Sequence, residues 1–264
     1  MFYSKYIALK KKFKRALPWQ IVEAIIYIKF YNSKIPNHDL YLKYIKNRSG
    51  LEIGGPSTIF KGALPLYQYA LSIDGVNFSA ETVWEGEIAT GQSYNYYADK
   101  RGRQFVSDAT ELAQIDNETY DFVLSSNCIE HIANPVKAIF EWRRVLRAGV
   151  ALILVAPNNV SNFDHKRNIT SFEHIIQDYQ SEIGECDLTH LDEILSFHDL
   201  SRDRRAGSIS KFAERSRQNF LNRTLHHHVF SIDLLENILK YCGFDIAVTT
   251  ESKFDLFVMA IKQN

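Results

Sequence analysis

The sequence has 264 residues, 45% hydrophobic and 13% aromatic, which is enough apolar material for one packed α/β domain with an elaboration and excludes global disorder. Its 31 basic and 31 acidic residues cancel, so no field over the whole chain attracts nucleic acid. The three cysteines, Cys128, Cys186 and Cys242, are odd in number and far apart. They predict reduced thiols in a cytoplasmic compartment, not a disulfide framework or a zinc site built from cysteines.

Residues 1–47 predict an N-terminal helical extension. The part before Pro18 is basic and contains no acid, with Lys5, Lys10, Lys11, Lys12, Lys14 and Arg15. Glu23 and Lys29 interrupt the apolar stretch that follows, and no small-residue cleavage site is present, so this is neither a transmembrane helix nor a signal peptide. Two interpretations stay open: an amphipathic helix packed on the domain, or peripheral contact with the anionic inner face of a membrane.

Short apolar runs predict the strands of the first half of the chain. They are residues 50–53, the segment YALSID ending at Asp74, the segment QFVSDATEL with its end at Asp108, and YDFVLSS at residues 120–126. The last run is continuously apolar, as expected for a strand buried on both faces. The polar and aromatic segment 77–103 is expected to be loop with irregular helix.

The second half begins with a clear helix. Asn134 can cap it, Pro135 suits its first turn, and Gly149 is expected to end it. The segment VALILVAP predicts a fifth strand, and a helix is expected at residues 231–242. FDIAVTT and DLFVMAIK follow with a short connection, which requires an antiparallel pair.

Strands that alternate with helices predict parallel pairing. We therefore expect an α/β fold at residues 48–264: a doubly wound, seven-stranded, mostly parallel sheet with an antiparallel C-terminal hairpin. The His- and Arg-rich segment 158–225 is too long for a plain loop and is expected to form a mostly helical cap over the substrate.

Polar side chains stand at the carboxyl ends of the predicted strands, where open α/β sheets bind ligands. They are Glu52, Asp74, Asp108 and Asn127. Asp74 follows Glu52 by about the twenty residues expected of a ribose-binding carboxylate. The loop LEIGGPSTIF lacks the third glycine of G-x-G-x-x-G, and Pro56 has no N–H for a pyrophosphate, which argues against a dinucleotide.

The string DFVLSSNCIEHIANPVKAIFEWRRVLRAG resembles the class I S-adenosylmethionine-dependent methyltransferases, and the resemblance covers residues 51–157 and 225–262. It implies the Rossmann-like methyltransferase fold and S-adenosylmethionine as cofactor. It also implies Glu52, Gly54, Gly55 and Asn127 near the methionine portion, Asp74 with Gly75 at the ribose, Asp108 with Ala109 at the adenine, and Pro56 and Ser57 in a variant loop.

Methyl transfer to a hydroxyl requires removal of its proton, by a metal or by a base. For the metal, NCIEH resembles the E-x-x-E-H string of ubiquinone-biosynthesis and small-RNA 2′-O-methyltransferases. That resemblance implies a divalent cation, Mg²⁺ or Mn²⁺, held by Asn127, Glu130, His131 and His228, although Asn127 replaces a carboxylate. For the base, His165 is the first candidate, followed by His131 and His174.

We expect an S-adenosylmethionine-dependent O-methyltransferase that acts on a sugar hydroxyl in surface-glycan or nucleotide-sugar metabolism. A phosphorylated substrate would suit the basic stretch of the cap, which contains Arg202, Arg204, Arg205, Lys211, Arg215 and Arg217. An RNA-ribose methyltransferase, a small-molecule C- or N-methyltransferase and a non-catalytic scaffold stay open, although the sequence carries no strong nucleic-acid signal.

Overall fold

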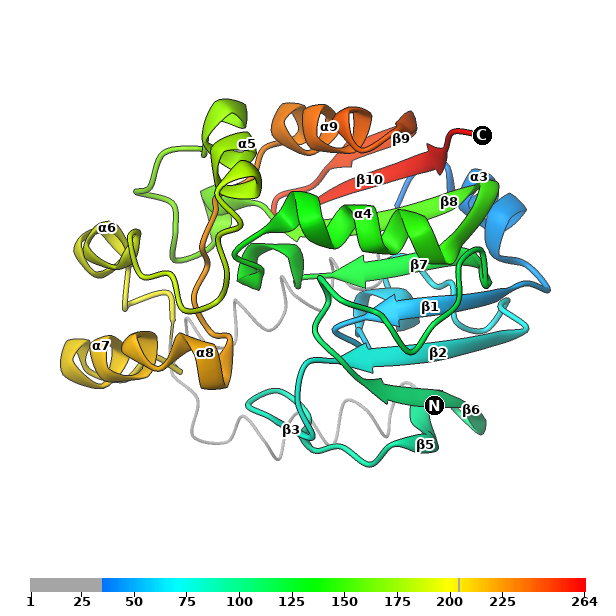
Figure 1. The fold of residues 1–264 in the computed structure, drawn as a ribbon, viewed down its shortest axis with the longest axis horizontal. Coiled ribbons are helices and arrows are strands. Elements are labelled where there is room, and N and C mark those ends of the chain that lie inside the picture. Colours follow the sequence, from blue (N-terminus) through cyan, green and yellow to red (C-terminus); the bar gives the residue numbers. More distant parts are fainter. Residues whose placement is uncertain (1–34, 204) are drawn as a thin grey trace, which may run out of the picture.

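A computed structural model of the protein describes residues 35–203 and 205–264, and a single large sheet forms its centre (Figure 1). Its strands are β1 (Ser49–Ile53), β2 (Ser72–Asn77), β5 (Gly91–Tyr97), β6 (Lys100–Val106), β7 (Tyr120–Ser126), β8 (Leu146–Pro157), β9 (Phe244–Glu251) and β10 (Asp255–Lys262). Their order across the sheet is β5-β6-β2-β1-β7-β8-β10-β9. The predicted doubly wound sheet is confirmed, and the edge strand β5 makes it eight-stranded instead of seven-stranded.

The pairing of the strands creates a ligand-binding edge. β1 pairs in parallel with β2 on one side and with β7 on the other, so the strand order reverses between β1 and β7. Open α/β sheets bind ligands at the carboxyl ends of the strands beside such a point. β10 is antiparallel to both β8 and β9, which confirms the predicted C-terminal hairpin.

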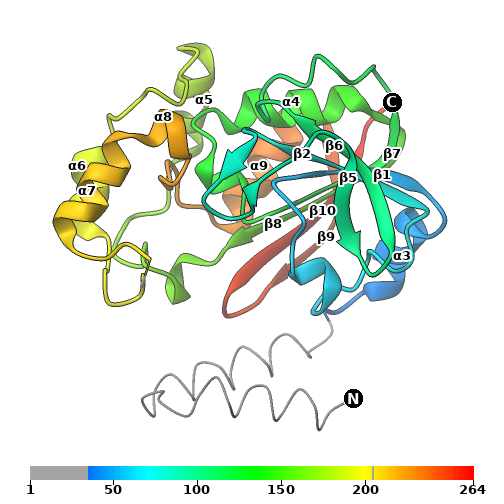
Figure 2. The same ribbon diagram turned by 90° about the horizontal axis from the view of Figure 1, so that it is seen from below.

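Helices cover both faces of the sheet (Figure 2). On one face lie α4 (Pro135–Val145) and α9 (Ile232–Tyr241), with α5 (Phe172–Gln180) packed against them. On the other lies α3 (His38–Ile45), together with the chain between β1 and β2. The two faces hold separate apolar cores, one around the fully buried Trp142 and the other around Tyr41 and Tyr67.

The start of α4 follows the sequence prediction, but its end does not. The Asn134 side chain accepts a hydrogen bond from the backbone N–H of Lys137, and Pro135 occupies the first turn. The helix ends at Val145, where the chain passes directly into β8. Gly149 therefore lies inside β8, with a positive φ of 70°, and does not terminate the helix.

The segment between β8 and α9, predicted to be a mostly helical cap, consists of short helices joined by turns and loops. After α5 it forms α6 (Leu191–Phe197), α7 (Ile209–Arg217) and α8 (Asn219–Asn222). These helices lie beyond the ends to which the arrowheads of β1, β2 and β7 point (Figure 1). They enclose a small apolar core of their own, with Ile194, Ala206, Phe212 and Leu225. Short 3₁₀ helices follow β1, β7 and β8, at Ile59–Lys61, Ile129–His131 and Asn159–Ser161.

The prediction of loop and irregular helix at residues 77–103 is wrong. Asn77 still belongs to β2, and the segment continues with the hairpin β3 (Glu81–Thr82) and β4 (Gly86–Glu87) and the edge strand β5. Tyr94 and Tyr96 of β5 are buried on alternate positions, where they pack on the second core. This alternation stabilises a strand on the sheet edge.

Of the predicted N-terminal extension, the structure describes only residues 35–47, which include α3. The predicted contact of the basic segment with a membrane or with the domain lies outside the described residues. Within the described part of the chain, every helix is too short or too polar to cross a bilayer.

Candidate active site

Glu52 supports the loop after β1 from beneath. Its side chain is fully buried, and its Oε2 accepts hydrogen bonds from the hydroxyls of Tyr67 at 2.5 Å and Tyr94 at 2.6 Å. Its Oε1 accepts the backbone N–H of Ser57 at 3.1 Å. Burial raises the pKa of Glu52, and these hydrogen bonds oppose the rise. Glu52 therefore braces the loop from within the core, and its contact with the methionine portion stays a prediction.

The glycine pair after β1 is required by this arrangement. Gly54 has a φ of +76°, which side-chain-bearing residues rarely adopt. A Cβ on Gly55 would lie 2.2 Å from the hydroxyl oxygen of Tyr94 and 2.3 Å from Cδ of Glu52. The Gly-Gly turn thus lets the backbone pass close over a buried carboxylate before the chain reaches Pro56.

Asp74 lies away from the ligand edge, although the sequence placed it at the end of β2. It is the third residue of β2, where its Oδ1 accepts the backbone N–H of Arg103 at 2.7 Å and its Oδ2 accepts the hydroxyl of Tyr120 at 2.8 Å. β2 continues to Asn77, whose side-chain amide donates to the Gly55 carbonyl oxygen at 3.2 Å. Asn77 therefore stands where the sequence placed Asp74.

A cavity of about 680 Å³ opens at the carboxyl ends of the parallel strands. This volume is within the range of small-molecule sites. Its wall combines residues that follow β1, β2, β6 and β7 with residues from the cap and from the β3–β4 hairpin. From the strand ends these are Gly54, Pro56, Ser57, Asn77, Phe78, Asp108, Ala109 and Asn127. Six of the predicted cofactor residues line it, whereas Glu52, Gly55, Asp74 and Gly75 are outside its described lining.

Asp108 and Asn127 connect this wall to the rest of the molecule. The Asp108 carboxylate accepts a hydrogen bond from the guanidinium of Arg223, which belongs to the cap, at 3.0 Å. Arg223 also forms an ion pair with Glu185 at 2.9 Å, so its charge is already matched.

Asn127, which has a φ of +48°, forms a side-chain hydrogen bond to Asp255 at the start of β10. Burial raises the pKa of Asp255 to about 6, and this hydrogen bond opposes the rise.

An aspartate–histidine pair lies on the cap side of the cavity. Asp164 Oδ2 is 2.5 Å from Nδ1 of His226, a residue of the cavity wall. Arg167 donates to the other oxygen of Asp164 at 3.1 Å and to the His226 carbonyl at 2.8 Å. Burial would raise the pKa of Asp164, but His226 and Arg167 lower it to about 2. Burial disfavours charge on His226, yet Asp164 outweighs it and raises the pKa of that imidazole.

His131 and Glu130 lie beside this pair. The rings of His131 and His226 are 4.6 Å apart, edge to face, and His131 Nδ1 is 3.0 Å from the Leu225 carbonyl oxygen. Burial, followed by the proximity of His226, lowers the pKa of His131 well below its usual value. Burial raises the pKa of Glu130 to about 7. Glu130, His131 and His226 each offer one atom to a group that could hold a cation.

The other predicted histidines lie elsewhere. His165 Nε2 pairs with Asp199 Oδ2 at 2.9 Å, outside the described lining of the cavity. His174 and His228 belong to a separate cluster in the cap, so His228 is not brought beside Glu130 and His131. The three consecutive histidines diverge: His226 contacts Asp164, His227 lies 3.0 Å from the Asn219 amide, and His228 lies 3.1 Å from the Ala133 carbonyl oxygen.

The basic stretch of the cap is only partly directed at the cavity. Arg205 lines it. Arg202 instead donates to the carbonyl oxygens of Val160 and Asn162, and Arg215 is 3.6 Å from Asp203. Arg204 lies outside the described residues.

Comparison with known proteins supports the fold. A family model described as a methyltransferase domain matches residues 52–154. No curated protein is similar enough in sequence to match the chain. An S-adenosylmethionine-dependent methyltransferase from Mesorhizobium loti shares 12% identity and a TM-score of 0.51, with 86% of this chain and 96% of that chain covered.

A methyltransferase from Methanosarcina mazei has a TM-score of 0.48 at 16% identity, covering 88% of this chain and 99% of that one. The strand order and the similarity to the Mesorhizobium loti protein show the class I S-adenosylmethionine-dependent methyltransferase fold. Within this fold, residues 52–154 match the methyltransferase-domain model.

Proposed function

We propose that the protein methylates a hydroxyl oxygen, with His226 as the base that removes the hydroxyl proton. The observation that carries this proposal is the 2.5 Å contact of buried Asp164 with His226, which lines the cavity. Carbon and already nucleophilic nitrogen acceptors have less need of such a base, whereas a hydroxyl is a weak nucleophile until its proton is removed.

Residues at the strand ends would hold the cofactor. Gly54 and Asn127 would contact the methionine portion, Asn77 and Phe78 the ribose, and Asp108 with Ala109 the adenine. When bound, S-adenosylmethionine supplies an electrophilic methyl group on a sulfonium. The carboxamide of Asn77 is fixed by its hydrogen bond to Gly55, so it can present its oxygen to a ribose hydroxyl.

The Asp164–His226 pair sets the tautomer of the base. With its Nδ1–H donated to the carboxylate, the neutral imidazole has its lone pair on Nε2. The acceptor hydroxyl would give its proton to Nε2 as its oxygen bonds to the methyl carbon. The sulfur–methyl bond would break with its electron pair left on sulfur, giving S-adenosylhomocysteine, and Asp164 would stabilise the imidazolium. His131 stays uncharged beside it because burial lowers its pKa, so it does not repel this cation.

A cation held by Glu130, His131 and His226 is the competing arrangement for proton removal. The positions of the implied ligands favour the base. The four residues implied by resemblance are not together, because His228 is in the other cluster.

A sugar hydroxyl, as in a glycan or a nucleotide sugar, is the acceptor that suits the cavity best. The cap side offers polar groups that can hydrogen-bond a polar acceptor, among them Asn162 and Arg205. The Arg205 guanidinium would pair with a phosphate of the substrate. RNA ribose is the second candidate acceptor, since it offers the same hydroxyl chemistry.

The proposal is tested with labelled S-adenosylmethionine and four acceptor classes: nucleotide sugars, sugar phosphates, neutral oligosaccharides and a ribo-oligonucleotide. Mass spectrometry of the product identifies the methylated atom. Transfer to a hydroxyl that is lost in His226→Asn and retained in Glu130→Gln supports the base. Transfer to carbon or nitrogen overturns the proposal, and loss in Glu130→Gln with cofactor binding intact favours the cation.

A further inference from the structure

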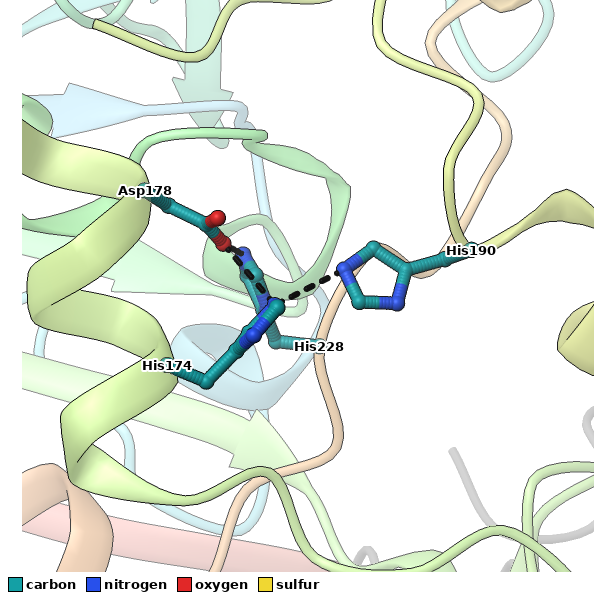
Figure 3. Close-up of side chains that lie close together, drawn as sticks. All are labelled: His174, Asp178, His190 and His228. Atoms are coloured by element: carbon teal, nitrogen blue, oxygen red, sulfur yellow. Dashed lines mark hydrogen bonds and ion pairs between the residues drawn. The ribbon is translucent and has the colours of Figure 1, made fainter. Parts of the chain in front are cut away.

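A second group of convergent side chains lies in the cap, outside the described lining of the cofactor cavity (Figure 3). It contains His174, Asp178, His190 and His228, which we call the cap histidine cluster. His174 and Asp178 are one turn apart on α5, so both project from the same face of that helix. His190 immediately precedes α6, and His228 lies between α8 and α9. Figure 3 shows the four side chains directed toward a common point.

The distances within the cluster match those between ligands of one metal ion. His174 Nε2 is 3.0 Å from His190 Nε2 and 3.2 Å from Asp178 Oδ2. His228 Nε2 is 3.6 Å from the same Asp178 oxygen. One atom from each of the four residues lies within 4.8 Å of the other three. Tetrahedral zinc with bonds of about 2.0–2.1 Å separates its ligand atoms by about 3.3 Å.

Hydrogen bonds leave part of the cluster unsatisfied. His228 is 1% exposed, and its Nδ1 has no hydrogen-bond partner among the described residues. In the structure, His228 Nε2 lies 3.1 Å from the Ala133 carbonyl oxygen. To bind a cation, Nε2 would give up this contact, and the ring proton would be on Nδ1.

A carboxylate stands behind one of the proposed ligands. Glu193 Oε2 is 3.7 Å from Nδ1 of His190. Metal-bound histidines commonly have such a carboxylate on the other ring nitrogen.

We propose that His174, Asp178, His190 and His228 bind a zinc ion that ties the cap together. Three imidazoles and one carboxylate are a donor set suited to tetrahedral zinc, and they leave no position for a substrate. The ion would join α5, the start of α6 and the segment before α9. The inference is independent of the methyl acceptor and of the base.

The test uses the full chain, stripped of metal with a chelator, dialysed, and titrated with zinc chloride alone in a calorimeter. One equivalent of zinc is expected to bind and to raise the melting temperature. His190→Gln and Asp178→Asn should each weaken zinc binding on the order of 100-fold or more, since each removes one of four ligands. His165→Gln, a cap histidine paired with Asp199, is the matched control and should bind zinc as the wild type does.

S-adenosylhomocysteine binding, measured on the same metal-free samples, reports whether each variant is folded. Cobalt(II) provides the second readout, because a tetrahedral site gives intense visible absorption bands and a six-coordinate site gives weak ones. The proposal is overturned if the wild type binds no zinc, if the two ligand variants bind it unchanged, or if cobalt is six-coordinate. The cluster is then a hydrogen-bonded histidine group only, and the proposed methyl transfer is unaffected.

Discussion

Asp164 and His226 are 62 residues apart in the sequence, and their side chains meet at 2.5 Å behind the cavity wall, which His226 lines. Arg167 fixes both partners, through the Asp164 carboxylate and the His226 carbonyl oxygen. A carboxylate on one ring nitrogen orients the imidazole and stabilises its protonated form. This relationship is what a general base facing a bound acceptor requires.

Asp164→Asn should lower kcat on the order of 100-fold or more, because the base loses its orienting carboxylate. It should also shift the acidic limb of the kcat/KM profile to lower pH. The neutral form of His226 is the active one, and Asp164 raises its pKa, so removal of the carboxylate lowers that pKa. The measurement is the pH–rate profile of both proteins, with His165→Asn as control. An unmoved acidic limb would exclude His226 as the titrating base.

Asn77→Ala should weaken S-adenosylhomocysteine binding by about fivefold, the effect of losing one hydrogen bond of about 1 kcal/mol. Asp74→Asn should leave the affinity unchanged, because Asp74 bonds to Arg103 and Tyr120 away from the cavity. Calorimetric titration of both variants decides between the two residues. Weaker binding in Asp74→Asn with unchanged binding in Asn77→Ala would instead identify Asp74 as the ribose ligand.

Gly55→Ala should destabilise the protein by about 1–3 kcal/mol, the usual effect of overpacking. The new Cβ would be 2.2 Å from the Tyr94 hydroxyl oxygen, so the loop or the Glu52 network must move. Weaker cofactor binding should accompany the loss. Gly184→Ala is the matched control: a Cβ there has no atom within 4 Å, and urea unfolding should change by less than about 0.5 kcal/mol.

Relative to the wild type, the Asp255→Asn variant should gain stability against unfolding as the pH rises. Burial raises the folded-state pKa of Asp255 from 3.8 to about 6, so the unfolded chain ionises first. The wild type therefore loses stability between these two values, by a total of about 3 kcal/mol, and the uncharged variant does not. Urea unfolding of both proteins at about pH 4.5 and about pH 7.5 measures the effect. An equal difference at both pH values would contradict the raised pKa.

The alternation of strands and helices, the Asn134 cap and the C-terminal hairpin are local signals, and they predicted the sheet correctly. The end of β2 was misplaced because Gly75 interrupts the apolar run. In the structure, the missing side chain of Gly75 makes room for the Tyr94 ring, which a Cβ would approach to 2.2 Å. The sequence did contain a signal for β5, because Tyr94 and Tyr96 alternate with Asn95, which is exposed. The strand was not predicted because the surrounding segment is polar.

The pairing of Asp164 with His226 could not be predicted. Helical and strand periodicity relate only residues that are close in the sequence, and these two residues lie on separate segments of the cap. Five histidines compete within residues 165–226, and His226 is the first of three in a row that face different partners. The only local indication was that Asp164 and Arg167 stand three residues apart, as they do in their ion pair. That spacing predicts a contact between these two and says nothing of His226.

The most direct test is a crystal structure of the protein with S-adenosylmethionine bound. We predict that the adenosine lies between Asn77 and Asp108, and that the methyl group faces the His226 ring with room for one hydroxyl oxygen between them. A methyl group directed away from His226, or a cofactor bound outside this cavity, would contradict the account.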